Sequence, residues 1–229
     1  MRISVAGENS FILYFDEKPS SELTASIQQT VIAIDTKLSQ YLIDLVPSYA
    51  SILVIYDQTK IDYRRFRKAI GALINTTNVI HSEGAETEGK LVELPVYYGE
   101  DAALDLNALA QRAKLTTNEV VNIHQAKEYR VYAIGFAPGF AYLGEVDKRI
   151  ATPRLETPRL KVPKGAVAIA DKQTAVYPAE SPGGWNIIGR CPLSMFNSGA
   201  QETMPVSVGD RVKFTAISRQ EYFNLGGEL

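Results

Sequence analysis

Hydrophobic residues in the first eighty positions follow two spacings, one typical of strands and one typical of helices. Short apolar runs bounded by turn residues predict strands, and apolar side chains three, four and seven positions apart predict two amphipathic helices. Ser20 or Ser21 is the expected cap of the first helix, and the second helix is expected from about Asp62. The predicted strands cover residues 3–6, 11–15, 41–46 and 51–56. This order predicts a small α+β domain, a ferredoxin-like sandwich with both helices on one face of an antiparallel sheet.

Residues 81–89 interrupt this pattern. They contain three glutamates, two glycines and no large apolar side chain, so they have little to bury. We therefore expect a linker here, between a domain of residues 1–80 and a second domain of residues 90–229.

The second domain is expected to be mainly β. Two short helices are predicted near its start, one capped by Asp105 and one opened by the capping box from Thr116 to Glu119. Beyond Tyr129, many short apolar runs stand between Gly and Pro residues, and two more flank the turn at 208–210. Such a series of short strands predicts a closed or nearly closed β-barrel.

Composition points to one stretch of this second domain as the functional site. Between Gly135 and Arg190 lie six of the eleven prolines and seven of the sixteen glycines. Proline stiffens loops and glycine allows close backbone approach, so this stretch is typical of a pre-shaped site. Residues 148–164 hold six basic side chains against one acid, in a chain of net charge -2. A local positive field in an acidic protein suits a small anion or a docking partner and argues against nucleic acid.

Other compositional features exclude several classes of protein. The apolar runs are far shorter than the roughly 20 residues of a membrane span, and the first ten residues are too polar for a signal peptide. We expect a cytoplasmic protein without membrane contact. Cys191 is the only cysteine and cannot form an internal disulfide, and with two histidines a structural metal site is not expected.

Two Thr-Pro-Arg units carry the candidate anion ligands Arg154 and Arg159. A guanidinium group offers a planar fork of donors that matches a carboxylate or a phosphate. Five residues apart on a strand, the two side chains would point to opposite faces, so they converge only if the chain turns near Leu155 and Glu156. The alternative is a solvated basic loop in which Glu156 neutralises one arginine.

Three further features have a structural and a functional interpretation. Gly183 and Gly184 can present backbone N–H groups to an anion directly before Trp185, whose indole would floor a flat ligand or simply fill the core. The aromatic turn from Phe136 to Tyr142 would wall a pocket or plug the barrel. His124 lies near a helix end, where the dipole favours its charged form, and would act as a proton carrier or merely end the helix.

Three blocks, GFAPGFAYLG, TPRLETPRLKVPKG and YPAESPGGWNIIGR, closely resemble the signature blocks of the KipI family. That family includes the PxpB component of bacterial 5-oxoprolinase and allophanate-hydrolase subunit 1-like proteins. The resemblance covers the whole chain, and Glu145 is the one position where a second glycine would be expected after Gly144.

The resemblance implies a cyclophilin-like barrel from about residue 90 and the ATP-driven opening of 5-oxoproline to glutamate. It also implies two companion subunits, one with the same barrel (PxpC type) and one of PxpA type, with ATP and its Mg²⁺ counter-ion as the nucleotide. A related ATP-dependent hydrolase of amides or urea derivatives is an alternative. Another is a non-catalytic regulator whose barrel groove grips a peptide of a sensor histidine kinase.

These observations give a set of candidate site residues. Arg154, Arg159 and His124 are the expected catalytic residues. Contacts to the substrate or to an anion are expected from Lys164, Gly183, Gly184, Trp185, Phe136, Tyr142, Tyr177 and Arg190.

Overall fold

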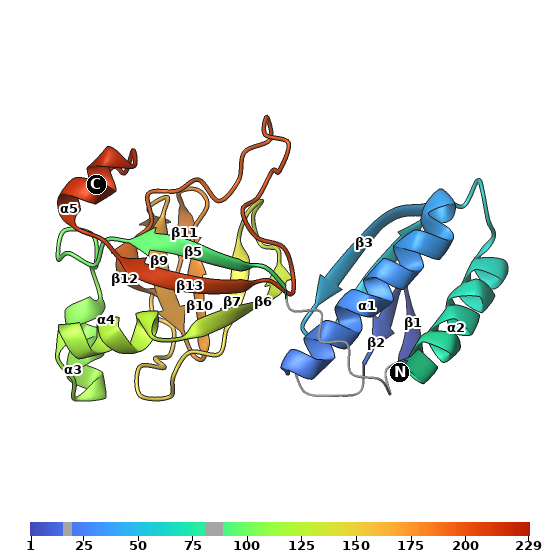
Figure 1. Cartoon of the computed structure of the whole chain (residues 1–229), viewed down its shortest axis with the longest axis horizontal. Coiled ribbons are helices and arrows are strands. Elements are labelled where there is room, and N and C mark those ends of the chain that lie inside the picture. The colour runs from blue at the N-terminus through green and yellow to red at the C-terminus, as the bar shows by residue number, and fades with distance from the viewer. Residues whose placement is uncertain (16–19, 81–88) are drawn as a thin grey trace. The chain divides into compact units, whose positions relative to one another are not determined.

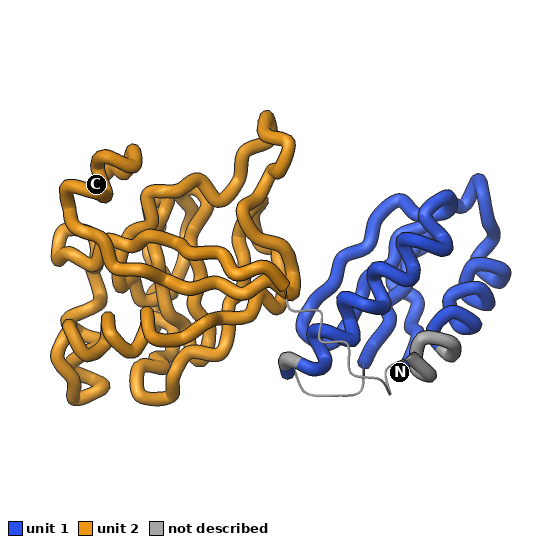
Figure 2. Tube along the Cα trace, in the orientation of Figure 1, with its two compact units in different colours: residues 1–88 blue, residues 89–229 orange. Residues whose placement is uncertain are grey.

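The computed structural model describes residues 1–15, 20–80 and 89–229 (Figure 1). The chain divides into two compact units, residues 1–88 and residues 89–229 (Figure 2). The expected linker at 81–89 lies outside the described residues, apart from Gly89.

The first unit is a four-stranded antiparallel sheet with two helices. Ser20 caps the first helix by accepting a hydrogen bond from the backbone N–H of Leu23. The sheet order is β1-β2-β4-β3. Its elements are β1 (Arg2–Gly7), β2 (Ser10–Tyr14), α1 (Ser21–Leu38), a 3-10 turn (Ser39–Tyr41), β3 (Leu42–Ser48), β4 (Ser51–Tyr56) and α2 (Tyr63–Ile80).

The strand connectivity of this unit differs from the ferredoxin-like order that we expected. A ferredoxin-like domain runs βαββαβ, whereas this unit runs ββαββα. The cause is local, because the turn at Glu8 and Asn9 folds β2 directly back onto β1, and no helix separates them. The core is as predicted: Phe11, Ile52 and Val54 on the sheet pack with apolar side chains of both helices.

The second unit is mainly β, with three short helices. The capping box from Thr116 to Glu119 opens α4 as predicted. The elements are β5 (Leu91–Val96), α3 (Leu106–Ala113), α4 (Thr117–Gln125), β6 (Glu128–Ile134), β7 (Ala141–Gly144), β8 (Arg159–Val162), β9 (Ala166–Ala170), β10 (Gln173–Val176), β11 (Ser181–Gly183), β12 (Asn186–Arg190), β13 (Arg211–Ala216) and α5 (Arg219–Asn224).

Seven of these strands form one sheet that closes almost completely. Its order is β12-β9-β10-β7-β6-β13-β5, while β8 and β11 form a separate ribbon. Tyr97, just after β5, exchanges two backbone hydrogen bonds with Arg190 at the end of β12, at 2.9 and 2.8 Å. These bonds join the two outermost strands of the sheet, so the expected nearly closed barrel is observed.

Strand β9 is buried on both faces because it separates two hydrophobic clusters. Val167 and Ile169 point into the main core, which also contains side chains of α3 and α4. The alternate residues, Ala166, Ala168 and Ala170, face a smaller aromatic cluster. Their small side chains leave room on that face for the aromatic rings of the candidate site.

One predicted strand is absent from the described residues. Only the second half of the segment around the 208–210 turn is a strand, β13. The carboxylate of Asp210 accepts hydrogen bonds from the backbone N–H groups of Ser207 and Lys90, at 2.8 and 3.0 Å. These bonds hold the preceding residues in a loop.

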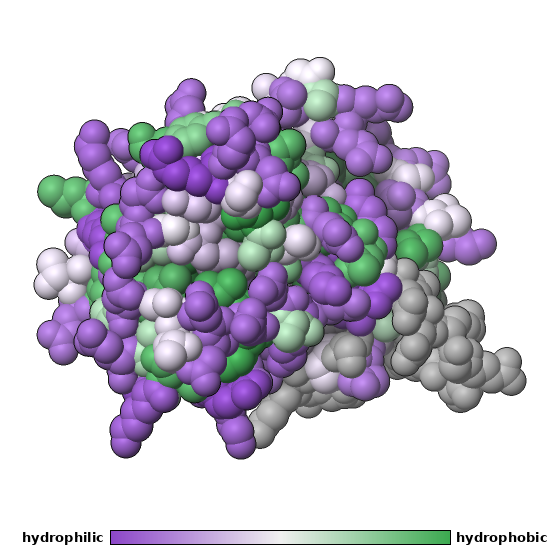
Figure 3. All heavy atoms as spheres, turned by 60° about the vertical axis from the view of Figure 1, so that its left-hand side comes forward, coloured by the Kyte–Doolittle hydropathy of each residue, from purple (hydrophilic) through white to green (hydrophobic). Residues whose placement is uncertain are grey.

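The face of the molecule shown in Figure 3 carries hydrophilic side chains around small hydrophobic areas. Among the described helices, none has the length and apolar character that crossing a membrane requires.

Candidate functional site

The candidate site is built on an aromatic cluster around Phe140. The Phe140 ring meets Trp185 edge-on, with centroids 5.6 Å apart, and meets Tyr142 and Tyr177 at 4.9 and 5.2 Å. Edge-to-face contacts of this kind fix ring orientation beyond simple burial. Trp185 is only 4% exposed, so it is a core side chain that also forms the floor of the site.

The loop that carries the two arginines is tied to the strand behind it. The backbone N–H of Leu155 donates to the carbonyl of Gly184 at 2.7 Å. The Asn186 side-chain amide donates to the carbonyl of Pro153 at 2.9 Å. The chain bends at residues 156–157, close to the position required for the two arginines to converge.

Arg154 and Arg159 both act on Tyr177. Burial raises the pKa of the Tyr177 hydroxyl, and the positive charges of the two arginines oppose this rise. The exposed guanidinium of Arg154 lies 5.8 Å from the centroid of the Trp185 ring, within the range of a cation–π contact. The two arginines therefore gather at one aromatic cluster.

Arg159 is held by a carboxylate whose role the sequence did not reveal. Its Nη2 lies 2.6 Å from Oδ1 of Asp105, a largely buried residue. The other Asp105 oxygen accepts the backbone N–H of Ile187 at 2.7 Å. Asp105 was expected to cap α3, but its side chain makes no capping hydrogen bond. It instead fixes Arg159, which comes from a distant part of the sequence.

One guanidinium nitrogen of Arg159 is left over. Nη1 is buried and has no hydrogen-bond partner among the described residues. A buried charged donor without a partner is costly, so such a group is suited to an oxygen of a bound ligand. The arrangement can therefore bind an anion beside a flat aromatic surface.

The glycines of the 183–184 turn allow this close packing. A Cβ atom on Gly183 would collide with the Tyr177 hydroxyl, and one on Gly184 would lie 3.5 Å from the carbonyl of Leu155. Phe136, by contrast, is 66% exposed at the rim, with its ring 5.2 Å from that of Phe140.

Lys164 and Arg190 do not join the cluster as expected. The Arg190 guanidinium donates to the backbone carbonyls of Lys164 and Glu228, at 3.0 and 3.3 Å. Its side chain therefore connects the C-terminal segment to the barrel. Lys164 itself is exposed and contributes its carbonyl to this contact.

The expectation of a charged His124 is wrong. The ring is fully buried and stacks on Phe214 at 4.5 Å. Nδ1 lies 2.8 Å from the Tyr98 hydroxyl, and Nε2 lies 3.1 Å from the Thr174 hydroxyl. Burial lowers the pKa of His124 to about 3, so the ring is neutral. Desolvation outweighs the helix dipole, and His124 is a core residue.

Metal binding finds no support in the part of the chain that the structure describes. Those residues contain no group of three or more His, Cys, Asp or Glu side chains able to hold a metal ion.

The family description "Carboxyltransferase domain, subdomain C and D" matches residues 1–206. A relative from Bacillus subtilis (strain 168), whose name gives it as the B-type component of 5-oxoprolinase, is 33% identical over 96% of this chain and 95% of its own length.

Solved structures share the fold. TTHA0988 matches 91% of this chain with a TM-score of 0.78 at 33% identity, and the match spans only 40% of that longer protein. The Kluyveromyces lactis urea amidolyase matches 97% of this chain with a TM-score of 0.76 at 16% identity. This second likeness shows the fold alone.

Proposed function

Because this chain belongs to the family of carboxyltransferase subdomains C and D, and its Bacillus subtilis relative is named as a component of 5-oxoprolinase, we propose that it is one subunit of an ATP-dependent 5-oxoprolinase. The membership expected from the three sequence blocks is thereby confirmed. In the proposed reaction the complex opens 5-oxo-L-proline to L-glutamate, with companion subunits of PxpA and PxpC type.

The observation that carries this proposal is the pairing of a flat aromatic floor with two arginines, one of which keeps a buried donor unused. 5-Oxoproline is a small, flat ring that bears one carboxylate. Its ring would lie against Trp185 and Phe140, and its carboxylate would accept hydrogen bonds from Arg154 and from Nη1 of Arg159. Each charge-assisted contact of this kind contributes about 1.5 to 3 kcal/mol.

A lactam resists water, which explains the need for ATP. The lactam oxygen attacks the γ-phosphorus of ATP, ADP leaves, and the resulting imidate is activated at carbon. One water adds to that carbon and the ring C–N bond breaks with proton transfer to nitrogen, leaving an acyl phosphate. A second water hydrolyses it to glutamate and phosphate. This chain's role in the sequence is to hold the substrate carboxylate in position.

The test is a reconstitution with 5-oxoproline and ATP. The chain alone should release no glutamate, because the aromatic cluster contains cations for a carboxylate but no group assigned to phosphoryl transfer. Glutamate and ADP should form in equal amounts when the two companion subunits are added. Equal turnover with and without this chain would reject the proposal.

Exposed apolar side chains beside the site support the second candidate, a regulator that binds a peptide of a sensor histidine kinase. Phe136 and Leu160 are 66% and 87% exposed, and a small carboxylic acid has no need of them. Inhibition of kinase autophosphorylation by this chain, with no 5-oxoproline turnover in any reconstituted complex, would favour this alternative.

A further inference from the structure

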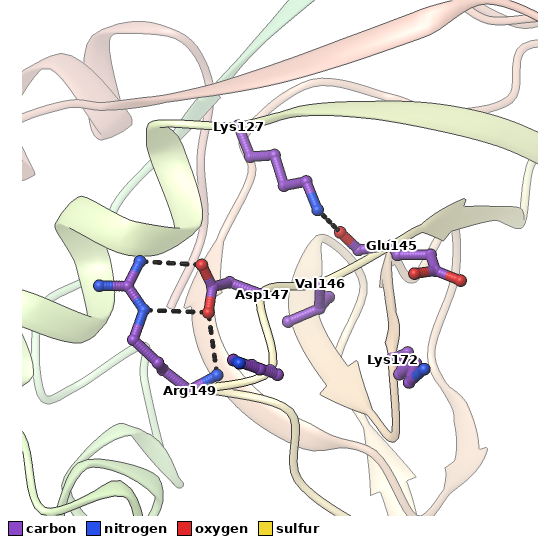
Figure 4. A pocket seen from close by; sticks show the side chains of 7 residues that line it. Lys127, Glu145, Val146, Asp147, Arg149 and Lys172 are labelled. Carbon is purple, nitrogen blue, oxygen red and sulfur yellow. Dashed lines mark hydrogen bonds and ion pairs between the residues drawn. The ribbon is translucent and has the colours of Figure 1, made fainter. Parts of the chain in front are cut away.

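The basic stretch of residues 148–164 serves two places in the barrel. Its later arginines reach the aromatic cluster, but Lys148 and Arg149 line a separate pocket of about 470 Å³ (Figure 4). The other residues lining this pocket are Lys127, Glu145, Val146, Asp147 and Lys172. Four cationic side chains thus face two carboxylates.

Strand register places this pocket away from the proposed substrate site. Tyr142 lies near the start of β7 and Tyr177 directly follows β10, whereas Glu145 follows β7 and Lys172 precedes β10. The two strands are antiparallel neighbours, so the pocket lies at the opposite end of both. Five residues of strand, from Lys172 to Tyr177, span about 17 Å.

Hydrogen bonds fix the walls of the pocket. The backbone N–H of Val146 donates to the carbonyl of Lys172 at 2.8 Å, and the Lys127 ammonium donates to the carbonyl of Glu145 at 2.7 Å. Figure 4 shows Arg149 gripping both oxygens of Asp147, at 3.0 and 2.8 Å. That pairing uses one of the two carboxylates.

The remaining charge is unbalanced. Lys127 keeps its full charge because its partner is a neutral carbonyl, and Lys148 and Lys172 have no carboxylate partner among the described residues. Only the Glu145 carboxylate opposes these three ammonium groups. Lysine is a point charge suited to phosphate oxygens, and a pocket of this volume accommodates more than a single ion.

We propose that this pocket binds the phosphate chain of a small polyphosphate compound, with Lys127, Lys148 and Lys172 as its ligands. No aromatic side chain lines it, so a nucleoside base gains no stacking surface here. A nucleotide and inorganic tripolyphosphate therefore share the chemistry that is recognised. The further step, that this compound is the ATP of the reaction, rests on the proposed function.

Titration calorimetry on the full chain tests the proposal without any turnover. Tripolyphosphate and ATP should bind with similar affinity, and adenosine should not bind. Lys148→Gln with Lys172→Gln should weaken tripolyphosphate binding at least about tenfold, since each lost lysine removes a charge-assisted contact. The control, Lys37→Gln with Lys68→Gln, makes the same change in net charge on exposed helix positions of the first unit and should leave affinity unchanged.

Glu145→Gln supplies an arm that misfolding cannot mimic. Removing the one opposing carboxylate should strengthen tripolyphosphate binding severalfold. The proposal is overturned if the double lysine variant and its control bind equally, if Glu145→Gln does not tighten binding, or if adenosine binds as well as ATP. Arg154→Ala should leave this affinity intact, so failure here is distinguishable from failure of the substrate site.

Discussion

The Asp105–Arg159 ion pair should couple two segments of the barrel that are distant in sequence. The perturbation is a double-mutant cycle with Asp105→Asn, Arg159→Met and both together. Asparagine keeps an oxygen for the backbone N–H of Ile187, and methionine keeps the apolar stem of the arginine. Neither variant retains the charge pair.

The structure sets the expected magnitude. A hydrogen bond between charged groups contributes about 1.5 to 3 kcal/mol. The Asp105 and Arg159 side chains are 11% and 28% exposed, so solvent weakens the pair only partly, and we expect a coupling energy in the lower half of that range, about 2 kcal/mol. Asp105→Asn alone should lower the melting temperature by about 4 to 8 °C.

Urea unfolding followed by tryptophan fluorescence is the assay, because Trp185 is the single tryptophan of the chain and lies buried in the cluster beside the pair. Four unfolding curves give the coupling energy directly. A value below about 0.5 kcal/mol would refute the argument that Asp105 positions Arg159.

Two further predictions concern single residues. Because burial lowers the pKa of His124 from 6.5 to about 3, the unfolded chain takes up a proton that the folded chain refuses, and the free energy of unfolding should fall by about 1.4 kcal/mol per pH unit as pH drops from 6.5 towards 3. His124→Gln should remove this part of the slope, and identical pH profiles would contradict it. Gly183→Ala should push the Tyr177 hydroxyl aside and lower the activity of the assembled enzyme, whereas Gly71→Ala, with nothing within 4 Å of the new Cβ, should not. Equal activity of the two variants in the glutamate-release assay would show that the 183–184 turn does not shape the site.

Local signals in the sequence predicted local structure well. The Ser20 cap and the Thr116–Glu119 capping box depend on residues three positions apart, and both are present. Alternating apolar residues likewise identified the strands of the first unit. Its connectivity was wrong because strand pairing is non-local, and the pattern that marks a strand does not name its neighbour.

The site was predictable only where composition carried the signal. The Pro- and Gly-rich stretch correctly placed Arg154, Arg159, Trp185 and Tyr142 together. Asp105 was not found, because an aspartate before a helix is typical of a cap and its true partner lies 54 positions away. The sequence also gave no sign that His124 would be buried, since the aromatic side chains around it come from separate strands.

The contacts of Arg159 change one expectation about mutations. Arg159→Ala would remove a largely buried ion pair as well as a ligand contact, so loss of activity there mixes stability with binding. Arg154 is exposed and lies over the indole ring without an ion pair in the described part of the chain. Arg154 is therefore the cleaner probe of the site.

The central claim is that Arg154 holds the carboxylate of the cyclic substrate, and kcat/KM for 5-oxoproline in the assembled enzyme tests it most directly. Arg154→Ala should lower this value at least about tenfold without changing the melting temperature, and Arg154→Lys should restore little, because lysine lacks the planar fork. Lys161→Ala is the matched control, since it removes a solvent-exposed charge from the neighbouring β8 strand. The account predicts loss in the arginine variants and full activity in the control, and wild-type kcat/KM in Arg154→Ala would contradict it.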